Sequence, residues 1–347
     1  MRSRGLQLAR GYYVDVVRPL LHAAWPSLPH AAARLGGGSE VLGLDDETSR
    51  DHDFGLRLTL LVEHEQVEPV RELLQEKLPE SYAGEPVRFA TSWDSDPQRH
   101  RVDVLTIETL TDRLLGLHPA GEWDAADWLS LTGQSVLEVT AGPVFHDGLG
   151  ALDGLRRRLH WYPRDVERYV LAADWQRLAQ ELPFVGRAGH RGDDLGSRVV
   201  TGRLVRTVMH LGFLLHRRWA PYPKWFGSCF SQLPNSPRVG AALSAALATD
   251  QWRERQAALA AAVEELHALQ RSRGLPTDPS PAVEPFHVRP FVVVRDAVAQ
   301  LLLDDVTDPL VRRLPTGIGA VEQWVDSVDV LIDPVKRRAL TSSWRVS

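Results

Sequence analysis

The sequence predicts an α+β protein in which a small mixed sheet is followed by a mainly α-helical region. Short runs with the apolar pattern of strands are confined to the first third of the chain. From about residue 110 onward, almost every segment shows the apolar spacing of helices instead. A chain of 347 residues usually forms about two domains. We therefore expect one domain at 1–117 and a second, helical domain at 118–347.

The composition excludes several classes of protein. Hydrophobic residues make up 44% and charged residues 24% of the chain, which excludes a disordered or fibrous protein. The single cysteine, Cys229, rules out an internal disulfide and a cysteine-built zinc site, which fits a reducing cytoplasm. Residues 1–21 predict an amphipathic helix rather than a signal peptide. No stretch approaches the roughly 20 uninterrupted apolar residues of a membrane span, so we expect a cytoplasmic protein without a membrane partner.

The expected sheet lies within the first domain. An apolar run beginning at His30 breaks into three glycines, which indicates a short strand ending in a tight loop. The apolar core Leu58–Val62 is typical of a central strand, and the spacing after it is helical. Two later apolar runs, separated by the polar turn DSDPQRH, extend the sheet to about Thr109. The expected elements are strands at 30–35, 58–62, 86–93 and 101–110, with a helix at 67–79.

The second domain is expected to be helical throughout. Apolar residues recur at helical spacing in almost every segment after Thr109, and a proline-rich stretch at 274–285 indicates a connector. No internal repeat occurs at a fixed period, which excludes a solenoid. Helices are expected at 111–117, 124–131, 150–162, 165–182, 195–219 and 239–273, and apolar segments at 288–306 and 318–331 close the domain.

Three features in the first domain carry chemistry. Gly38 and Ser39 end a glycine run whose backbone N–H groups and hydroxyl suit a phosphate. Asp51 and Asp53 lie two residues apart, so in an extended strand their carboxylates point to one face and suit divalent cations. Asp103, between two valines, would supply a third carboxylate from a neighbouring strand. Converging acids of this kind are what metal-assisted phosphoryl transfer requires.

The order of these features resembles the signature of the DNA polymerase beta-like nucleotidyltransferase superfamily, which has a Gly-Ser pair, an Asp-x-Asp on the next strand and an acid on a later strand. Longer segments resemble one bacterial branch of that superfamily, in which this domain is joined to a helical domain of unknown function. These segments are GGSEVLGLDDETSRDHDFG, RGDD near Arg191, FLLHRRWAPYPKWFG and IGAVEQWVDSVD. Aminoglycoside nucleotidyltransferases, such as the kanamycin enzyme, are similar at a greater distance and share a two-domain plan.

The resemblance implies a magnesium-dependent enzyme with a catalytic first domain and an acceptor-binding or lid-like second domain. It implies that Asp51 and Asp53 bind two Mg²⁺ ions and that Asp103 binds one of them and takes the acceptor proton. Gly38 and Ser39 would hold the phosphates of ATP or another nucleoside triphosphate. The expected reaction moves a nucleoside monophosphate to a hydroxyl of a small molecule or a protein and releases pyrophosphate. The resemblance leaves the acceptor and the oligomeric state open.

Three further residues are candidates outside the signature. Arg50 directly precedes the acids and either braces a phosphate or pairs with Asp46. Lys224 lies among prolines and aromatic residues after a long helix, which favours contact with the nucleotide over simple packing. Asp193 is an alternative general base, but helix starts are often capped by such acids, and capping is the preferred interpretation.

Two other functions stay open as alternatives. A catalytically inactive nucleotide-binding module would have lost one of the metal-binding acids, and all three are present. An RNA-directed nucleotidyltransferase would need a basic groove. The runs 156–158, 217–218 and 336–338 are basic, but solvated helix faces produce such runs, and the formal net charge of -5 disfavours nucleic acid as a partner. A zinc site would require His52, which lies between two acids, to converge with His210 and His216 from a separate element, and it is disfavoured.

Overall fold

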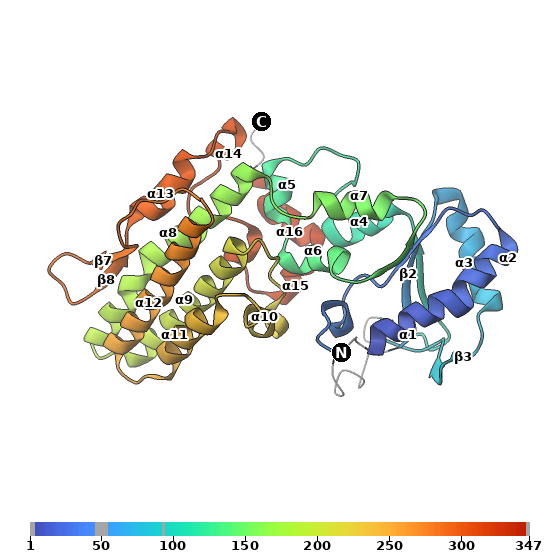
Figure 1. The fold of residues 1–347 in the computed structure, drawn as a ribbon, viewed down its shortest axis with the longest axis horizontal. Coiled ribbons are helices and arrows are strands. Elements are labelled where there is room, and N and C mark those ends of the chain that lie inside the picture. Colours follow the sequence, from blue (N-terminus) through green and yellow to red (C-terminus); the bar gives the residue numbers. More distant parts are fainter. Residues whose placement is uncertain (1–3, 46–54, 92–93, 345–347) are drawn as a thin grey trace. The chain divides into compact units, whose positions relative to one another are not determined.

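The computed structural model describes residues 4–45, 55–91 and 94–344 (Figure 1). Within it the chain forms two compact units. Unit 1 comprises Met1–Glu122 and Ser135–His160, and unit 2 comprises Trp123–Gln134 and Trp161–Ser347. The expected domains at 1–117 and 118–347 stay a prediction. The compact units differ from them mainly at 135–160, because part of this segment pairs with the sheet of unit 1.

The α+β fold class predicted from the sequence is confirmed. Unit 1 contains a four-stranded mixed sheet in the order β5-β2-β1-β6. Strands β2 and β5 are parallel, whereas β1 is antiparallel to both β2 and β6. The strands are β1 (Ala31–Ala33), β2 (Arg57–Leu61), β5 (Arg101–Leu105) and β6 (Val144–Asp147).

Strand β6 is not among the elements that the sequence predicts. The carbonyl of Pro143, just before the strand, accepts a hydrogen bond of 3.1 Å from the backbone N–H of Arg34, just after β1. A Cβ atom on Gly142 would lie only 1.8 Å from the Arg34 carbonyl oxygen, so this close approach requires glycine. So short a strand is stabilised by its pairing with β1 rather than by an apolar pattern of its own.

The strand predicted at 86–93 is wrong. In the described part of this segment, the only strand residue is the end of β4 (Glu85–Pro86), which forms a small hairpin with β3 (Ser81–Tyr82). The rest makes isolated bridges. Arg101 Nε donates to the Phe89 carbonyl at 2.8 Å, so a side chain, rather than a strand ladder, holds the segment.

The strand predicted at 101–110 is too long. Strand β5 ends at Leu105, and helix α4 (Ile107–Leu115) begins two residues later. Thr106 caps this helix, because its Oγ1 accepts a hydrogen bond of 3.1 Å from the backbone N–H of Thr109. The apolar residues after Leu105 therefore continue the pattern without continuing the strand.

Helices cover one face of the sheet in unit 1. Helix α1 (Arg4–Tyr12) continues through a π-helical turn into α2 (Arg18–Ala24), and α3 (Val67–Lys77) follows β2. Alternation along the strands leaves Thr59 and Asp103 on the opposite face. The core on the helix side contains Leu58, Leu60, Val102 and Val104 from the strands and Tyr12, Val17, Leu21, Val70 and Leu74 from the helices. Unit 1 also contains most of α6 (Gly133–Thr140) and all of α7 (Ala151–Arg158).

Unit 2 is built on four helices that run side by side, α8 (Arg164–His190), α9 (Asp194–Leu215), α11 (Ser236–Ala248) and α12 (Trp252–Ser272) (Figure 1). The single helix predicted at 239–273 is wrong, because α11 and α12 are separate. Thr249 lies between them, and its Oγ1 accepts a hydrogen bond of 3.2 Å from the backbone N–H of Gln251. Threonine side chains compete with helical backbone bonds in this way.

The remaining elements of unit 2 are α5 (Ala125–Ser130), α10 (Pro223–Phe230), β7 (Val283–Pro285), β8 (Val292–Val294), α13 (Asp296–Asp304), α14 (Pro309–Arg312), α15 (Val328–Leu331) and α16 (Pro334–Thr341). The strands β7 and β8 form a hairpin that begins within the predicted connector. Among the described residues, no helix combines the length and the apolarity that a membrane crossing needs.

Candidate functional site

The candidate site lies at one edge of the sheet in unit 1. Strand pairing aligns Ala33 with Thr59, and Thr59 with Asp103. Because β1 is antiparallel to β2 while β5 is parallel to it, the end of β1 and the starts of β2 and β5 share one edge. The loop that carries Gly38 and Ser39 leaves β1 at this edge. The topology therefore brings the glycine loop and the strand of Asp103 to the same end of the sheet.

Charged side chains tie this loop to the start of β2. Glu40 Oε1 lies 2.5 Å from Arg34 Nη2 and 3.8 Å from Arg57 Nη1. Only 3% of the Arg34 side chain is exposed, and its Nη2 also donates to the Gly37 carbonyl at 2.8 Å. A buried guanidinium needs such partners, so its bonds hold the loop in one conformation. Arg34 and Glu40 are not among the site residues that the sequence predicts. The sequence signal for them is an arginine that ends an apolar strand just before a glycine run.

Gly38 gives the loop its shape. Its φ of 141° and ψ of 140° lie in a region that essentially only glycine adopts. A Cβ atom here would lie 2.5 Å from Glu40 Oε2 and 2.7 Å from Arg34 Nη2. The next residue, Ser39, is half-buried and begins a 3₁₀ turn, Ser39–Leu42. The contact of Gly38 and Ser39 with a phosphate stays a prediction.

Asp103 presents a carboxylate that is only weakly engaged. About half of its side chain is exposed (47%), whereas Val102 and Val104 on either side are buried, as the strand alternation requires. Asp103 Oδ2 lies 3.7 Å from Arg113 Nη1, and Arg113 is itself more than half exposed. An exposed pair of this kind contributes about 0 to 1 kcal/mol. The carboxylate of Asp103 is therefore available to a cation or to a proton from a substrate.

Asp94, an acid that precedes strand β5, has a structural role. Its Oδ2 accepts hydrogen bonds from Arg101 Nη1 at 2.8 Å and from Arg99 Nη1 at 3.1 Å. The hydrogen bond from Arg101, together with that from the backbone N–H of Asp96, lowers the pKa of the Asp94 carboxyl. Asp94 thus braces the turn before β5. The carboxylate of Asp103, on the strand itself, is the more exposed of the two.

Three of the predicted site residues, Arg50, Asp51 and Asp53, lie outside the described residues, and so does Asp46. Within the described ranges, no group of three His, Cys, Asp or Glu side chains is arranged to hold a metal ion. Asp103 alone offers one oxygen ligand of the type that Mg²⁺ prefers. A two-metal site at this edge therefore requires the two acids that precede β2.

The structure gives two predicted residues of the second domain ordinary local partners. Lys224, in the first turn of α10, is exposed, and its Nζ lies 5.0 Å from the centre of the Trp225 ring. Its contact with a nucleotide stays a prediction. Asp193 caps α9, because its Oδ1 accepts a hydrogen bond of 2.8 Å from the backbone N–H of Gly196. The preferred capping interpretation is confirmed.

His210 and His216, which were considered as zinc ligands, have protein partners. His216 Nε2 lies 2.6 Å from Asn235 Oδ1. His210 Nδ1 lies 2.7 Å from Asp174 Oδ2, and both side chains are almost fully buried. These contacts account for one nitrogen of each ring without a metal ion.

Known proteins offer a distant likeness. Residues 128–226, under a third of the chain, match the description of a domain of unknown function, DUF4037. The crystal structure of a nucleotidyltransferase-like protein from Exiguobacterium sibiricum 255-15 is similar with a TM-score of 0.33 and 15% identity, over 77% of this chain and 74% of that chain. No curated protein matches. The likeness is too distant to assign a role to any residue.

Proposed function

We propose that the protein is a magnesium-dependent nucleotidyltransferase that moves a nucleoside monophosphate, from ATP or another nucleoside triphosphate, to a hydroxyl of a small molecule or protein. The observation that carries the proposal is the edge of the unit 1 sheet. There a glycine loop held by Arg34 and Glu40 shares one end of the sheet with the half-exposed carboxylate of Asp103. A phosphate cradle and an available acid at one end of the same sheet suit nucleotide chemistry.

In this proposal the residues of the edge bind the triphosphate, hold the metal ions and accept a proton. Ser39 and the N–H groups after Gly38 hold the triphosphate, while Asp51, Asp53 and Asp103 hold magnesium. Bound Mg²⁺ would neutralise the phosphate oxygens. Asp103 accepts the proton of the acceptor hydroxyl, whose oxygen bonds to the α-phosphorus as the bond from that phosphorus to the bridging oxygen breaks and pyrophosphate leaves.

One arginine in each of the three basic runs has a protein partner, which supports a small-molecule or protein acceptor over RNA. Arg337 is fully buried and donates to the Ser130 carbonyl at 3.0 Å. Arg217 Nε donates to Glu167 Oε1 at 2.6 Å. Arg156 donates to the Val139 carbonyl at 3.0 Å. Arginines engaged in this way are not a free basic groove.

Isothermal titration of the four ribonucleoside triphosphates, with and without magnesium, tests the nucleotide site. We expect one of them to bind in a magnesium-dependent manner and the Asp51→Asn, Asp53→Asn double variant to bind about tenfold or more weakly. Asp112→Asn, an exposed acid on α4, is the matched control and should bind like the native chain. Absence of magnesium-dependent binding by the native chain would overturn the proposal.

Transfer is tested by incubating the native chain with a triphosphate labelled at the α-phosphate and a cell extract. Label in the small-molecule or protein fraction, lost in Asp103→Asn, would support the reaction and identify the acceptor class. Label in RNA would instead favour the RNA-directed alternative. Binding of a triphosphate without transfer to any fraction would favour the inactive nucleotide-binding module.

A further inference from the structure

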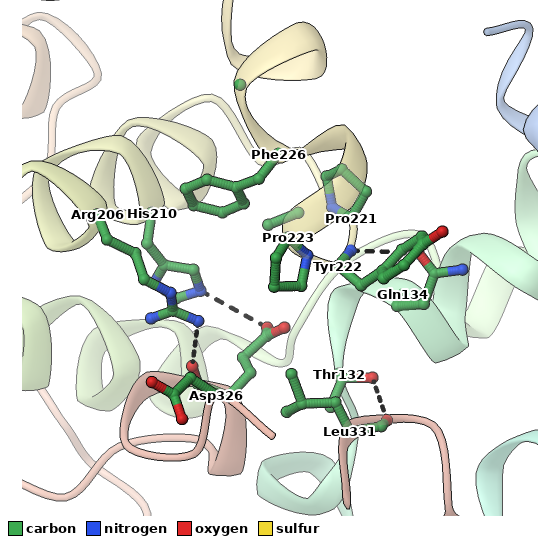
Figure 2. A pocket seen from close by; sticks show the side chains of 13 residues that line it. Thr132, Gln134, Arg206, His210, Pro221, Tyr222, Pro223, Phe226, Asp326 and Leu331 are labelled. Carbon is green, nitrogen blue, oxygen red and sulfur yellow. Dashed lines mark hydrogen bonds and ion pairs between the residues drawn. The ribbon is translucent and has the colours of Figure 1, made fainter. Parts of the chain in front are cut away.

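A second polar site lies entirely within unit 2, in a pocket of about 400 Å³ (Figure 2). Residues from α9, from the segment around α10 and from 322–331 line it. Figure 2 shows His210 and Phe226 on one side of the space and Thr132 and Leu331 on another. This volume lies at the lower end of the range for small-molecule pockets. Every lining residue belongs to unit 2.

His210 brings to this pocket a ring nitrogen that makes no hydrogen bond within the described residues. Its side chain is only 3% exposed, and its Nδ1 is engaged with Asp174 Oδ2 at 2.7 Å. Its Nε2 is buried and has no hydrogen-bond partner among the described residues. Glu322 Oε1 lies 3.6 Å from this nitrogen, just beyond hydrogen-bonding distance. Buried polar atoms are nearly always hydrogen-bonded, whereas His210 Nε2 has only the longer ion pair with Glu322, so a ligand or an ordered water that bridges the two side chains would complete its hydrogen bonding.

Glu322 supplies an acceptor beside this donor. Its Oε2 accepts a hydrogen bond of 2.8 Å from the backbone N–H of Gly133, which fixes the carboxylate and leaves Oε1 toward His210. Burial by itself lowers the pKa of His210, but Asp174 and Glu322 outweigh burial and raise the pKa to about 9. At neutral pH both ring nitrogens of His210 therefore carry protons. Nε2–H and Oε1 form a donor and an acceptor 3.6 Å apart.

A hydroxyl group matches this pair, because it both accepts and donates a hydrogen bond. It would accept from His210 Nε2–H and donate to Glu322 Oε1. An ammonium group would meet the His210 donor with another donor, and a carboxylate would meet Glu322 with another acceptor. The pair therefore favours a hydroxyl over either charged group.

The rest of the pocket suits the apolar face of a ring. Tyr222 and Phe226 line it together with two prolines. Arg206 lies over the Phe226 ring, and its Nη2 donates to the Glu322 carbonyl at 3.1 Å. With the exposed carboxylate of Asp326, Arg206 gives the pocket a polar rim. Aromatic walls with a few placed polar groups are typical of sites for small organic molecules.

We propose that this pocket binds a small hydroxylated ring compound of the sugar or cyclitol class, with one ring hydroxyl beside His210 Nε2 and Glu322 Oε1, hydrogen-bonded to both, and the ring against Tyr222 and Phe226. The inference goes beyond the proposed nucleotidyl transfer and does not depend on it. A bound water would be the alternative occupant of the same pair.

The test uses the full chain with histidine labelled at its ring nitrogens, and the Nε2 signal of His210 is followed by NMR. The probes are D-glucose, D-galactose, D-ribose, D-glucosamine and myo-inositol, each titrated to millimolar concentration. We expect at least one probe to shift the His210 signal saturably. If no probe does so, the pair holds only water and the proposal is overturned.

Three variants locate the binding. Glu322→Gln keeps an acceptor for Gly133 but turns an amide donor toward His210, and it should weaken binding about tenfold or more. Phe226→Leu leaves the buried charges intact and should also weaken binding. It provides the test if Glu322→Gln does not fold. Asp329→Asn, an exposed acid outside the pocket, is the matched control. Equal affinity of Phe226→Leu and the control would overturn the proposed location.

A final variant separates this inference from the proposed function. Asp103→Asn should leave sugar or cyclitol binding unchanged, because Asp103 is not among the residues that line the pocket. Failure of triphosphate binding together with intact binding in the unit 2 pocket would reject the nucleotidyltransferase proposal alone. The reverse result would reject the pocket proposal alone.

Discussion

The sheet edge of unit 1 and the His210 cluster of unit 2, which comprises Asp174, His210, Glu322 and Gln323, hold similar side chains in opposite environments. Asp103 at the edge is 47% exposed and has one exposed arginine 3.7 Å away. Asp174 in the cluster is 3% exposed, lies 2.7 Å from His210 and accepts a hydrogen bond of 2.7 Å from Gln323 Nε2. The carboxylate of Asp103 is thus largely solvated, whereas the carboxylate of Asp174 is bound by protein side chains.

This difference in exposure decides whether removal of a carboxylate affects ligand binding or folding. An exposed carboxylate keeps its water and exchanges it for a ligand, so its loss acts on binding. A buried carboxylate has already exchanged water for protein partners, so its loss leaves those partners uncompensated and acts on folding. The predictions below probe this contrast in order of the expected change in stability.

The largest effect is expected from Asp174→Ala. It leaves His210 buried without its closest carboxylate and should lower the free energy of unfolding by about 3 to 5 kcal/mol. The matched control is Asp305→Ala, which removes an acid that pairs with Arg168 at 3.0 Å but is one-third exposed. The control should lose clearly less than Asp174→Ala, because Arg168 keeps Glu167 at 2.8 Å and Arg164 is half-exposed. Urea unfolding measures both, and equal losses would contradict the contrast.

Alkaline pH should also destabilise the chain through His210. Burial alone lowers the pKa of His210, but Asp174 and Glu322 raise it to about 9, above the ordinary 6.5 of the unfolded chain. The resulting stabilisation is complete below pH 6.5 and is lost as the pH rises through about 9, a change of a few kcal/mol. Burial raises the pKa of the neighbouring Tyr162 well above 10, so Tyr162 does not titrate in this window.

Urea unfolding across this pH range measures the effect. Asp174→Ala serves as the comparison, because its His210 lacks the main source of the raised pKa. The native chain should lose stability between pH 6.5 and 9 more steeply than this variant. Parallel profiles would show that His210 does not carry the pH dependence.

A smaller effect is expected from Gly38→Ala. The positive φ of Gly38 and the closeness of Glu40 and Arg34 should make this change cost about 1 to 3 kcal/mol. Gly37→Ala is the matched control. Gly37 lies next to Gly38 and is exposed, and a Cβ there would come no closer than 3.8 Å to another residue. Thermal unfolding of both variants measures the difference. Equal stability would show that the loop is not held in the described conformation.

The smallest effect on stability is expected from Asp103→Asn. Its carboxylate is half-exposed and weakly paired, so the free energy of unfolding should change by about 0.5 kcal/mol or less. If the proposed function holds, magnesium-dependent binding of a triphosphate should nevertheless weaken about tenfold or more. Calorimetry and urea unfolding of the same preparation measure the two effects. Destabilisation without loss of triphosphate binding would contradict the expectation that an exposed carboxylate acts on binding and not on folding.

Local patterns were sufficient for the main elements of the fold. Alternation around Leu58–Val62 predicts β2, and the valines beside Asp103 predict both β5 and the outward direction of its acid. Helical spacing predicts the bundle of unit 2. These features depend on residues a few positions apart, where chain geometry alone decides which side chains share a face.

Other features depend on pairing that no local pattern records. Strand β6 is too short to be recognised without β1, and the break between α11 and α12 depends on the side chain of Thr249. The candidate site divides in the same way, because a Gly-Ser pair is visible in the sequence while the Arg34 and Glu40 contacts that hold it are not.

The sequence by itself determined the α+β class, the outward carboxylate of Asp103 and the order of the motif residues. The tertiary structure alone decided that Arg34 and Glu40 hold the glycine loop and that His210 and Glu322, more than a hundred positions apart, lie side by side in the wall of a pocket. The physical reason is that burial and pairing of charges are properties of packed surfaces. Such surfaces join distant segments, and their partners are specified only when the chain is folded.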